Sequence, residues 1–548
     1  MDSAGREAAA GNGAAEIGAA GASRAPAARE REQVEPFEEY ALRLSDSDDV
    51  AVVKRPLRAG MEIGAGAIRV TAAEDIRPGH KIALRPVAEG APVRKYGQVI
   101  GFATKPIEPG DWVHTHNLGM KDFDRAYECC VDARPLARYA PDQMRNFDGI
   151  RRPDGRVGTR NYVAVISSVN CSASVSRYVA DRFQGKEFKQ DFPHVDGVVP
   201  FTHKSGCGIQ PGEPHQLLER VLAGVARHPN IFGYVMIGLG CEVNQVQFIV
   251  RDYGLNLVRP DEPRPAFLNI QASGGVQRTV DAAAAAVARL LPSANAERRS
   301  TQPISRLILA ENCGGSDGAS GITANPALGA ASDELVRYGG ASVLAETPEI
   351  YGAEHLLVRR AVSSDVAERL LGFIRWWEDH ARAHGATIDN NPSWGNKEGG
   401  LTTIYEKSLG AVAKGGQAPL AAVYRYADRI DKPGLGFMDT PGYDPVSMTG
   451  LMAGGCTVGV FTTGRGSVYG CKPTPCIKVA TNTSLFENMN DDIDLNAGTI
   501  LDGTETIEQV GARIFEKIIA VASGERTKSE LQGIGDEEFA PWILGPTF

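Results

Sequence analysis

The sequence has no long apolar run and no export signal. Its 548 residues contain no stretch of about 18 consecutive apolar residues, and the chain does not begin with a basic segment followed by an apolar core. Neither a membrane span nor export is therefore expected. The net charge of -9 also argues against a nucleic-acid-binding protein, which needs a basic face to neutralise phosphates. We expect a soluble cytoplasmic protein with no membrane partner.

Cysteine is sparse and does not have the spacing of a compact metal motif. The nine cysteines are an odd number spread through a long chain, and most lie near glycine in loop-like sequence. Small secreted proteins held by disulfides have a different pattern. Since no CxxC motif occurs, a zinc or iron–sulfur site would have to be assembled from distant loops. We predict reduced thiols, some of them ligands or catalysts.

Large apolar side chains are almost missing from the first part of the chain. Residues 1–45 are rich in Ala and Gly and cannot bury enough surface to offset the entropy of ordering, so we predict a disordered tail. Short β-rich runs separated by Gly and Pro turns then predict a small β domain over residues 46–118. Residues 119–148 are expected to be a linker.

From residue 149 onward, strand-like and helix-like segments alternate. For example, DGVVPF leads through a loop to HQLLERVLAGVARH. This alternation predicts an α/β fold with parallel sheets, and the length favours more than one domain. We expect one α/β catalytic domain over residues 149–390 and a second over residues 391–548. The pattern leaves open whether the second part extends the first sheet.

Four cysteines share one position, just after a predicted strand in a loop that leads into a helix. In open α/β sheets the ligand crevice lies outside the carboxyl ends of the strands, so these loops should converge. A single cysteine in such a loop is commonly a small packing residue, and packing stays the alternative for each. The four residues are Cys171, Cys207, Cys241 and Cys313.

Glycine-rich loops carry further candidates. In ENCGGSDGASGITANP, glycines around Ser316 and Asp317 let the backbone approach a ligand, although a set of tight turns is the alternative. Arg465, between glycines in TTGRGSVYG, suits forked recognition of a carboxylate. Lys397, in PSWGNKEGG, is a candidate acid, base or charge clamp, or else a solvated loop residue.

Three histidines are candidates for metal binding or proton transfer. His114 and His116 lie two residues apart at the end of the small domain's last predicted strand, so they should point to one face and could share a metal ion. A surface pair without a metal is the alternative. His203 precedes Cys207 in FTHKSGCG and is either a general base or a structural residue that caps its loop.

Several long motifs resemble the altronate dehydratase and galactarate dehydratase family of sugar-acid hydro-lyases. The matching stretches include RPDGRVGTRNY, FTHKSGCG, IGLGCEVNQ, AETPEIYGAEHLL, NPSWGNKEGG, FTTGRGSVYG and IKVATNT. They run from about residue 149 to beyond residue 500, and the small β domain resembles the family's SAF domain. The resemblance implies dehydration of an aldonate or aldarate to a 2-keto-3-deoxy acid.

The resemblance also implies a divalent metal, with iron(II) first and manganese(II) second. An iron–sulfur cluster assembled from the cysteine loops is an alternative that rests on the residues alone. Removing the weakly acidic proton beside a carboxylate requires a base together with a metal or cationic groups. Glu349 joins the candidates because, like Glu346, it follows a strand end. The resemblance implies catalytic roles for His203, Lys397, Cys207 and Glu346, and substrate contacts from Arg160, Ser316, Asp317, Asn325, Arg465 and Lys478. We also predict metal contacts from His114, His116, Cys171, Cys241 and Cys313, although the family motifs match the cysteines in position only.

Other substrates and other classes of function stay open at this point. The VHTHN segment is similar to the altronate branch, whereas NCSASVSRY and YGCKPTPCIK depart from it, so galactarate and a sulfolactate-type sulfo-lyase are alternatives. A thiol hydrolase using Cys207 and His203 and a non-catalytic sugar-acid sensor are the rivals from other classes. We expect a small-molecule sugar acid as the partner of this protein. We also expect a homo-oligomer, because symmetric homo-oligomers are common among soluble proteins.

Overall fold

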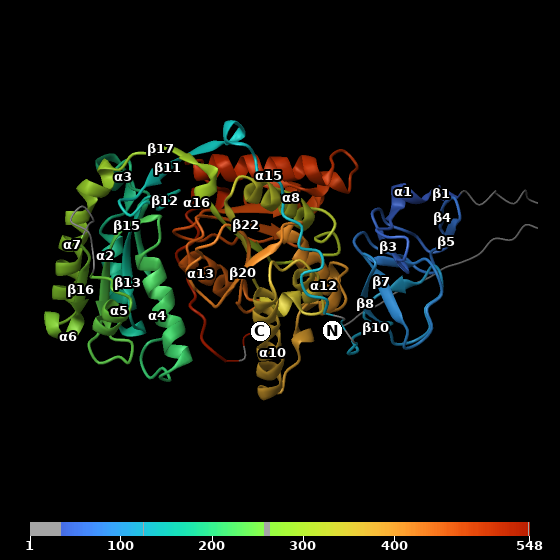
Figure 1. The fold of residues 1–548 in the computed structure, drawn as a ribbon, viewed down its shortest axis with the longest axis horizontal. Coiled ribbons are helices and arrows are strands. Elements are labelled where there is room, and N and C mark those ends of the chain that lie inside the picture. The colour runs from blue at the N-terminus through green and yellow to red at the C-terminus, as the bar shows by residue number, and fades with distance from the viewer. Residues whose placement is uncertain (1–33, 124, 126, 257–263, 546, 548) are drawn as a thin grey trace, which may run out of the picture.

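The computed structural model describes residues 34–123, 125, 127–256, 264–545 and 547 as three domains in a row. Figure 1 shows a small domain (residues 35–119, blue), a large domain (residues 304–545, yellow to red) in the centre, and a second domain (residues 146–303, cyan to green) at the far end. Among the helices that the structure describes, none has the length and apolar character needed to cross a membrane. Most of the predicted tail, residues 1–33, lies outside the described residues.

The small domain consists almost entirely of short strands, as the β-rich runs predicted. It begins earlier than expected, since residues 35–42 already pair with or pack on its sheets and Phe37 is buried. Its sheets have the orders β1-β4-β5, β2-β3-β6-β9 and β10-β8-β7. The elements are β1 (Glu35–Pro36), α1 (Phe37–Tyr40), β2 (Ala41–Leu42), β3 (Val50–Val53), β4 (Glu62–Ala65), β5 (Ile68–Thr71), β6 (Lys81–Ala83), β7 (Pro92–Lys95), β8 (Gln98–Ala103), β9 (Trp112–Val113) and β10 (Leu118–Gly119).

The second domain is a parallel four-stranded sheet covered by helices on both faces. Its strand order is β14-β13-β15-β16, and each pair is parallel. Because both faces are covered, the strands are nearly continuous apolar runs such as YVAVIS, all of it buried. The elements are β11 (Asn146–Arg151), β12 (Val157–Gly158), β13 (Tyr162–Ser167), α2 (Ala173–Asp181), α3 (Gly185–Asp191), β14 (Gly197–Phe201), α4 (Glu213–Ala226), β15 (Ile231–Gly238), α5 (Val246–Asp252), β16 (Ala266–Asn269), α6 (Ile270–Ser273), α7 (Val276–Ala296) and β17 (Ser300–Pro303).

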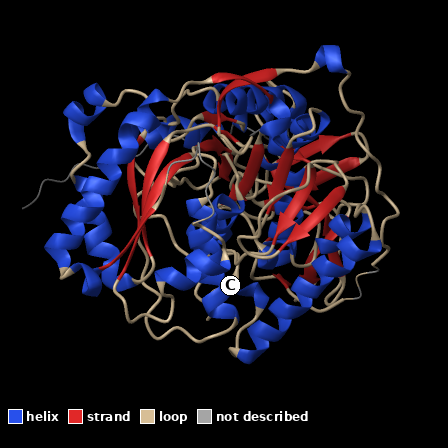
Figure 2. Ribbon diagram, turned by 60° about the vertical axis from the view of Figure 1, so that its left-hand side comes forward, coloured by secondary structure: helices blue, strands red, loops and turns tan. Residues whose placement is uncertain are grey.

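The large domain is built on a parallel seven-stranded sheet of order β20-β21-β19-β18-β22-β23-β24. Figure 2 shows this sheet and that of the second domain as two separate bodies, each with helices against it. The elements are β18 (Ile308–Cys313), α8 (Ala324–Arg337), β19 (Ala341–Leu344), α9 (Glu354–Arg359), α10 (Ser364–Ala383), α11 (Trp394–Glu398), α12 (Ile404–Val412), β20 (Leu420–Tyr424), β21 (Gly434–Met438), α13 (Asp444–Gly454), β22 (Val458–Thr463), β23 (Cys476–Ala480), α14 (Thr483–Asn488), β24 (Leu495–Asn496), α15 (Ile507–Ala522) and α16 (Lys528–Gln532).

The predicted α/β fold with a small N-terminal β domain is confirmed, but the domain boundary expected at residues 390 and 391 falls inside the large sheet. Strands β18 and β19 precede that point, and they pair with β22 and β21, which follow it. Alternation of strands and helices along a chain is a local signal. It does not show which distant strands pair, and so the expected boundary was wrong.

A buried ion triad joins the small domain to the large one. Lys81 and Lys95 of the small domain place their Nζ atoms 2.9 Å and 3.0 Å from the two carboxylate oxygens of Glu406 on α12. All three side chains are almost completely buried. The charges of the two lysines, acting against burial, hold the pKa of Glu406 well below its usual range. The backbones also approach closely, because a Cβ at Gly318 would lie 1.9 Å from the carbonyl oxygen of Gly79.

Replacing Glu406 with glutamine is expected to lower the free energy of unfolding by about 3–5 kcal/mol, because it leaves two lysine charges buried without their partner. Urea unfolding of the full chain measures the effect. The control is Glu108→Gln, at an exposed position of the small domain, which should stay within about 0.5 kcal/mol of the parent. Equal unfolding midpoints for the two variants would contradict the prediction.

Candidate active site

The topology of the large sheet predicts a ligand crevice between β18 and β22. From β18 the chain builds β19, β20 and β21 on one side, and β22 then lies on the other side of β18. Loops that leave the carboxyl ends of two such strands diverge and form the usual ligand crevice of an open parallel sheet. The loops at this point are residues 314–323 and 464–475, which contain two of the glycine-rich motifs.

At this edge of the sheet, three side chains of types that can ligate a metal form a buried cluster. Cys313 ends β18, and Glu346 and Glu349 lie in the loop after β19. One ligand atom from each residue lies within 4.8 Å of the others, and all three residues are buried. Glu346 has a left-handed backbone with φ of 71°, which is strained for a residue other than glycine and is found at functional sites. Asn312 orients its amide to donate to both carboxylate oxygens of Glu346 at 3.2 Å.

Two buried lysines neutralise this cluster. The Nζ of Lys414 donates to the Sγ of Cys313 at 2.9 Å and lies 3.5 Å from the Oε2 of Glu346. The Nζ of Lys407 donates to the Oε1 of Glu349 at 2.6 Å and to the Oδ1 of Asn391 at 2.9 Å. A buried charge is costly unless it is paired. Each lysine lies against an acid of the cluster, and this pairing of opposite charges explains how so many ionisable groups can share one interior site.

The acids of the site have strongly perturbed proton affinities. Burial, followed by the charge of Glu349, raises the pKa of Glu346 well above its ordinary value. Burial and the same Glu349 charge raise the pKa of Asp444, the first residue of α13, to about 7. Burial opposes the charged form of Lys407, but the Glu349 carboxylate raises its pKa above the usual value. The site thus combines an acid with a raised pKa, a second acid whose pKa is about 7, and two buried lysines.

Asp444 marks the opening of the cluster toward solvent. It is only half-buried, and the adjacent Tyr443 is 53% exposed. The carboxylate of Asp444 lies against the backbone of Gly314, where an added Cβ would come within 2.3 Å of its Oδ2. Any side chain at residue 314 would displace this carboxylate. Asp444 is therefore the most solvent-exposed acid of this group.

The donor set fits a divalent metal. A thiol and two carboxylates are ligands that iron(II) accepts together, and manganese(II) favours the carboxylates. The Oε2 of Glu349 is buried and has no hydrogen-bond partner among the described residues, so one ligand position is already free. The Oε1 of Glu349 and the Sγ of Cys313 accept hydrogen bonds from Lys407 and Lys414. A bound cation would have to displace these two ammonium groups or share the ligand atoms with them.

Four of the predicted site residues lie together at the outer part of the crevice. The amide of Asn396, beside Lys397 on α11, donates to the carbonyl oxygen of Ser316 at 2.8 Å. Asp317 accepts hydrogen bonds from Ser320, Thr481 and Asn482, so its carboxylate orders the loop. Arg465 lies 3.5 Å from Glu398, and both side chains are about half exposed. Arg465 is thus paired with an acid of α11, and a carboxylate-binding role for Lys397 and Arg465 stays a prediction.

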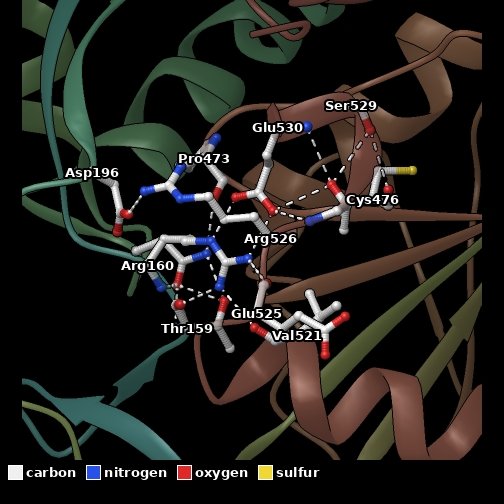
Figure 3. A network of polar contacts seen from close by, with 12 residues as sticks. Thr159, Arg160, Asp196, Pro473, Cys476, Val521, Glu525, Arg526, Ser529 and Glu530 are labelled. Atoms are coloured by element: carbon white, nitrogen blue, oxygen red, sulfur yellow. Dashed lines mark hydrogen bonds and ion pairs between the residues drawn. The ribbon is translucent and has the colours of Figure 1, made fainter. Parts of the chain in front are cut away.

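Three predicted substrate contacts make protein–protein bonds instead. The amide nitrogen of Asn325 donates to the carbonyl of Gly410, and its amide oxygen accepts from the hydroxyl of Thr462. Lys478 donates to the carbonyl of Tyr469 and the hydroxyl of Ser529. Figure 3 shows Arg160 in a forked pair with Glu530, at 2.6 Å and 2.8 Å, with further bonds to backbone carbonyls of the large domain. The Arg160 contacts tie the second domain to the large one, whereas those of Asn325 and Lys478 lie within the large domain. A substrate role for the three residues stays a prediction.

The histidines differ from their expected geometry. His114 and His116 do not share a strand face, because they lie in the turn that follows β9. His114 is buried and stacks on Trp112, whereas His116 is exposed. In His203, Nε2 donates to the carbonyl of Ser167 and Nδ1 accepts from the backbone of Ser205, while burial lowers the pKa to about 4. His203 caps its loop, which was the alternative to a general base.

The structure does not bring the five predicted metal ligands together. His114 and His116 belong to the small domain, Cys171 and Cys241 to the second domain, and Cys313 to the large domain. Within the described ranges, Cys313 with Glu346 and Glu349 is the group found within ligand distance of one ion. Cys207 is exposed in the second domain, and its catalytic role remains a prediction.

Sequence reasoning missed Lys407, Lys414 and Asp444. A signal for the lysines exists in IYEKSLGAVAKGG, since α12 is buried on every side and yet contains charged residues. A helix without an exposed face has no place for a solvated lysine, so charge within it indicates a buried partner. Asp444, which begins a helix, has no comparable local signal because its neighbours come from distant strands.

Comparison with known proteins places this site in a known family. Three family models match consecutive parts of the chain: the SAF domain of altronate/galactarate dehydratase at residues 39–121, the second domain of D-galactarate dehydratase/altronate hydrolase at 149–295, and the C-terminal part of D-galactarate/altronate dehydratase at 304–547. The chain belongs to the altronate and galactarate dehydratase family. This membership confirms the resemblance found in the sequence and makes the chain an enzyme of the hydro-lyase class.

Curated relatives align with nearly the whole chain. Altronate dehydratase of Bacillus subtilis (strain 168) is 34% identical over 89% of this chain and 96% of the relative. Altronate dehydratase of Escherichia coli (strain K12) is 35% identical, also over 89% and 96%. Galactarate dehydratase (L-threo-forming) of Escherichia coli (strain K12) is 36% identical over 91% and 96%. The family boundaries also agree with the three domains of the structure.

Proposed function

We propose that the chain is a metal-dependent dehydratase that converts a sugar acid, an aldonate such as altronate or an aldarate, to a 2-keto-3-deoxy acid. The observation that supports this best is the buried cluster of Glu346, Glu349, Lys407 and Lys414, with Asp444 at its opening. Paired acids with separated proton affinities next to fixed positive charge are what removal of an alpha proton and loss of a beta hydroxyl require.

In this proposal each of two acids carries out one proton transfer: Asp444 acts as the base and Glu346 as the acid. The Asp444 carboxylate takes the proton from the carbon beside the substrate carboxylate. The carbon–oxygen bond at the beta position then breaks, and the hydroxyl accepts the proton of Glu346 and leaves as water. The resulting enol loses its hydroxyl proton and gains a proton at the beta carbon, so that it becomes the 2-keto acid. Lys407 and Lys414 balance the negative charge that develops on the substrate, because their ammonium groups are held inside the low-dielectric site.

The divalent ion would be held by Cys313 and Glu349, with Glu346 beside it as the proton donor, and it would supply Lewis-acid charge to substrate oxygens. Iron(II) is preferred over manganese(II) because the set includes a thiol. We also propose a reducing, cytoplasmic location, because all nine cysteines are free thiols.

An anaerobic assay of the full chain, reconstituted with iron(II), tests the proposal against altronate, galactarate and related sugar acids. We expect 2-keto-3-deoxy acid from one or more of them, and loss of activity with a chelator that added iron(II) restores. Because the altronate and galactarate relatives are similarly identical to this chain, the assay also decides the substrate. Absence of product across the panel with iron bound would contradict the proposal.

A further inference from the structure

The second domain carries three exposed thiols at one edge of its sheet. Strands β14, β13 and β15 are neighbours and run parallel, and each is followed by a loop that contains one cysteine. These residues, Cys207, Cys171 and Cys241 respectively, are all free and exposed. The second domain contains no other cysteine. The three thiols therefore follow adjacent strands of one sheet, and they are all the cysteines that the second domain contains.

Hydrogen bonds hold the three loops against one another. The backbone nitrogen of Asn170, just before Cys171, donates to the carbonyl of Ser205 at 2.9 Å. The hydroxyl of Ser168 donates to the Oε1 of Glu242, next to Cys241, at 2.8 Å. The amide of Asn244 donates to the carbonyl of Ser168 at 3.3 Å. The loop after the central strand β13 is thus bonded to the loops on both of its sides.

Close backbone packing fixes the position of Cys207 in the same way. Gly206 has φ of 105° and lies so near the loop after β13 that an added Cβ would be 2.7 Å from the carbonyl oxygen of Ser168. A larger residue at 206 would push this loop away. The His203 ring, which bonds the end of β13 through Ser167, adds a second constraint on the Cys207 loop. The strand ends therefore present the thiols from a rigid frame.

The arrangement favours a polynuclear centre over a single ion. In the described chain these three sulfurs do not form a group within 4.8 Å, as ligands of one ion would. The cysteine sulfurs of an iron–sulfur cluster stand farther apart, because the cluster itself lies between them. Thiolates are also favoured beside α2, whose N-terminus follows Cys171 and carries positive dipole charge. Exposure of the thiols gives iron and sulfide access to the site.

We propose that Cys171, Cys207 and Cys241 bind a four-iron, four-sulfur cluster through three thiolates. Each thiol loses its proton as its sulfur bonds to iron, and the cluster forms from equal amounts of ferrous and ferric iron with inorganic sulfide, so no further oxidant is needed. One iron then has no protein thiolate and is open to an oxygen ligand. Two buried amide oxygens at this edge, of Asn244 and Asn269, have no donor among the described residues and are available to a hydroxyl there.

The test uses the full chain, reconstituted without oxygen with both iron states and sulfide. We expect acid-labile sulfide in proportion to iron, visible absorption of an iron–sulfur cluster, and a paramagnetic signal after reduction. Cys171→Ser, Cys207→Ser and Cys241→Ser should each lose most of the sulfide and absorption. The matched control is Cys129→Ser, which changes an exposed thiol of the linker and should keep both. Circular dichroism confirms that each variant is folded.

A second control separates this centre from the proposed active-site metal. Cys313→Ser, in the buried cluster of the large domain, should keep the labile sulfide and the visible absorption even where it reduces dehydratase activity. Absence of labile sulfide in the reconstituted parent protein would overturn the proposal, as would equal sulfide in the three variants and in Cys129→Ser. Zinc bound to these thiols in place of iron would overturn it too.

Discussion

Replacing Glu346 with glutamine is expected to lower kcat by about 10²- to 10⁴-fold, the usual contribution of one general acid. Glutamine keeps the size of the side chain and can still bond Asn312, but it has no acidic proton to give to the leaving hydroxyl. KM should change much less, because Glu346 is completely buried behind the opening of the site. Steady-state kinetics on the substrate found in the anaerobic assay measures both constants.

The matched control for this prediction is Glu311→Gln. Glu311 is another completely buried acid on β18, and burial raises its pKa to about 7, but its carboxylate bonds Ser342 rather than the cluster. If loss of a buried acid were harmful only through the fold, both variants would lose activity together. A parent-like kcat for Glu346→Gln would remove Glu346 from the mechanism.

Replacing Asp444 with asparagine is expected to lower kcat by a similar factor of about 10²- to 10⁴-fold and to change the pH profile. The parent should gain activity as the pH rises through about 7, where Asp444 becomes the carboxylate that acts as base. Since Asp444 and Glu349 interact, the observed midpoint belongs to the coupled group rather than to one residue. The variant should lack this rise. Profiles of kcat/KM against pH measure it.

Asp439→Asn is the control for the pH profile. Burial raises the pKa of Asp439 to about 6, but its carboxylate bonds Thr347 and Trp377, away from the crevice opening. This variant should keep the rise near neutrality even if its kcat falls. A rise that persists in Asp444→Asn would show that another group is the base.

The same raised pKa has a consequence for stability. The folded protein binds the Asp444 proton more tightly than the unfolded chain does, so the contribution of this group to stability is present at acid pH and is lost as the pH rises toward about 7. Asp444→Asn should therefore be more stable than the parent above neutral pH. Residues that lower stability in this way are typical of active sites.

Local patterns in the sequence predicted much of the architecture. The β-rich runs indicated the small domain, and the alternation of strands and helices indicated parallel α/β sheets. They also placed Cys171, Cys207 and Cys241 after strand ends, where the structure has them, and Cys313 one residue later than its place as the last residue of β18. These features depend on residues close together in the chain, and backbone geometry translates such patterns directly into elements.

Other features depend on contacts between distant residues. His114 and His116 were expected on one strand face, but the turn that begins after Val113 separates them. The four cysteines divide between two sheets, so Cys313 meets Glu346 and Lys414 rather than the other three thiols. Whether a cysteine after a strand joins one sheet or another is set by strand pairing, which no local pattern encodes.

The sequence by itself determined the fold class, the family and the loops from which the chemistry comes, because strand and helix periodicity and long motifs are properties of consecutive residues. The tertiary structure alone decided that Lys407, Lys414 and Asp444 complete the cluster around Glu346. Their proton affinities arise from burial and from charges supplied by β18, β19, α12 and α13 together. Desolvation and Coulomb interaction depend on distances in space, and these exist only once the strands have paired.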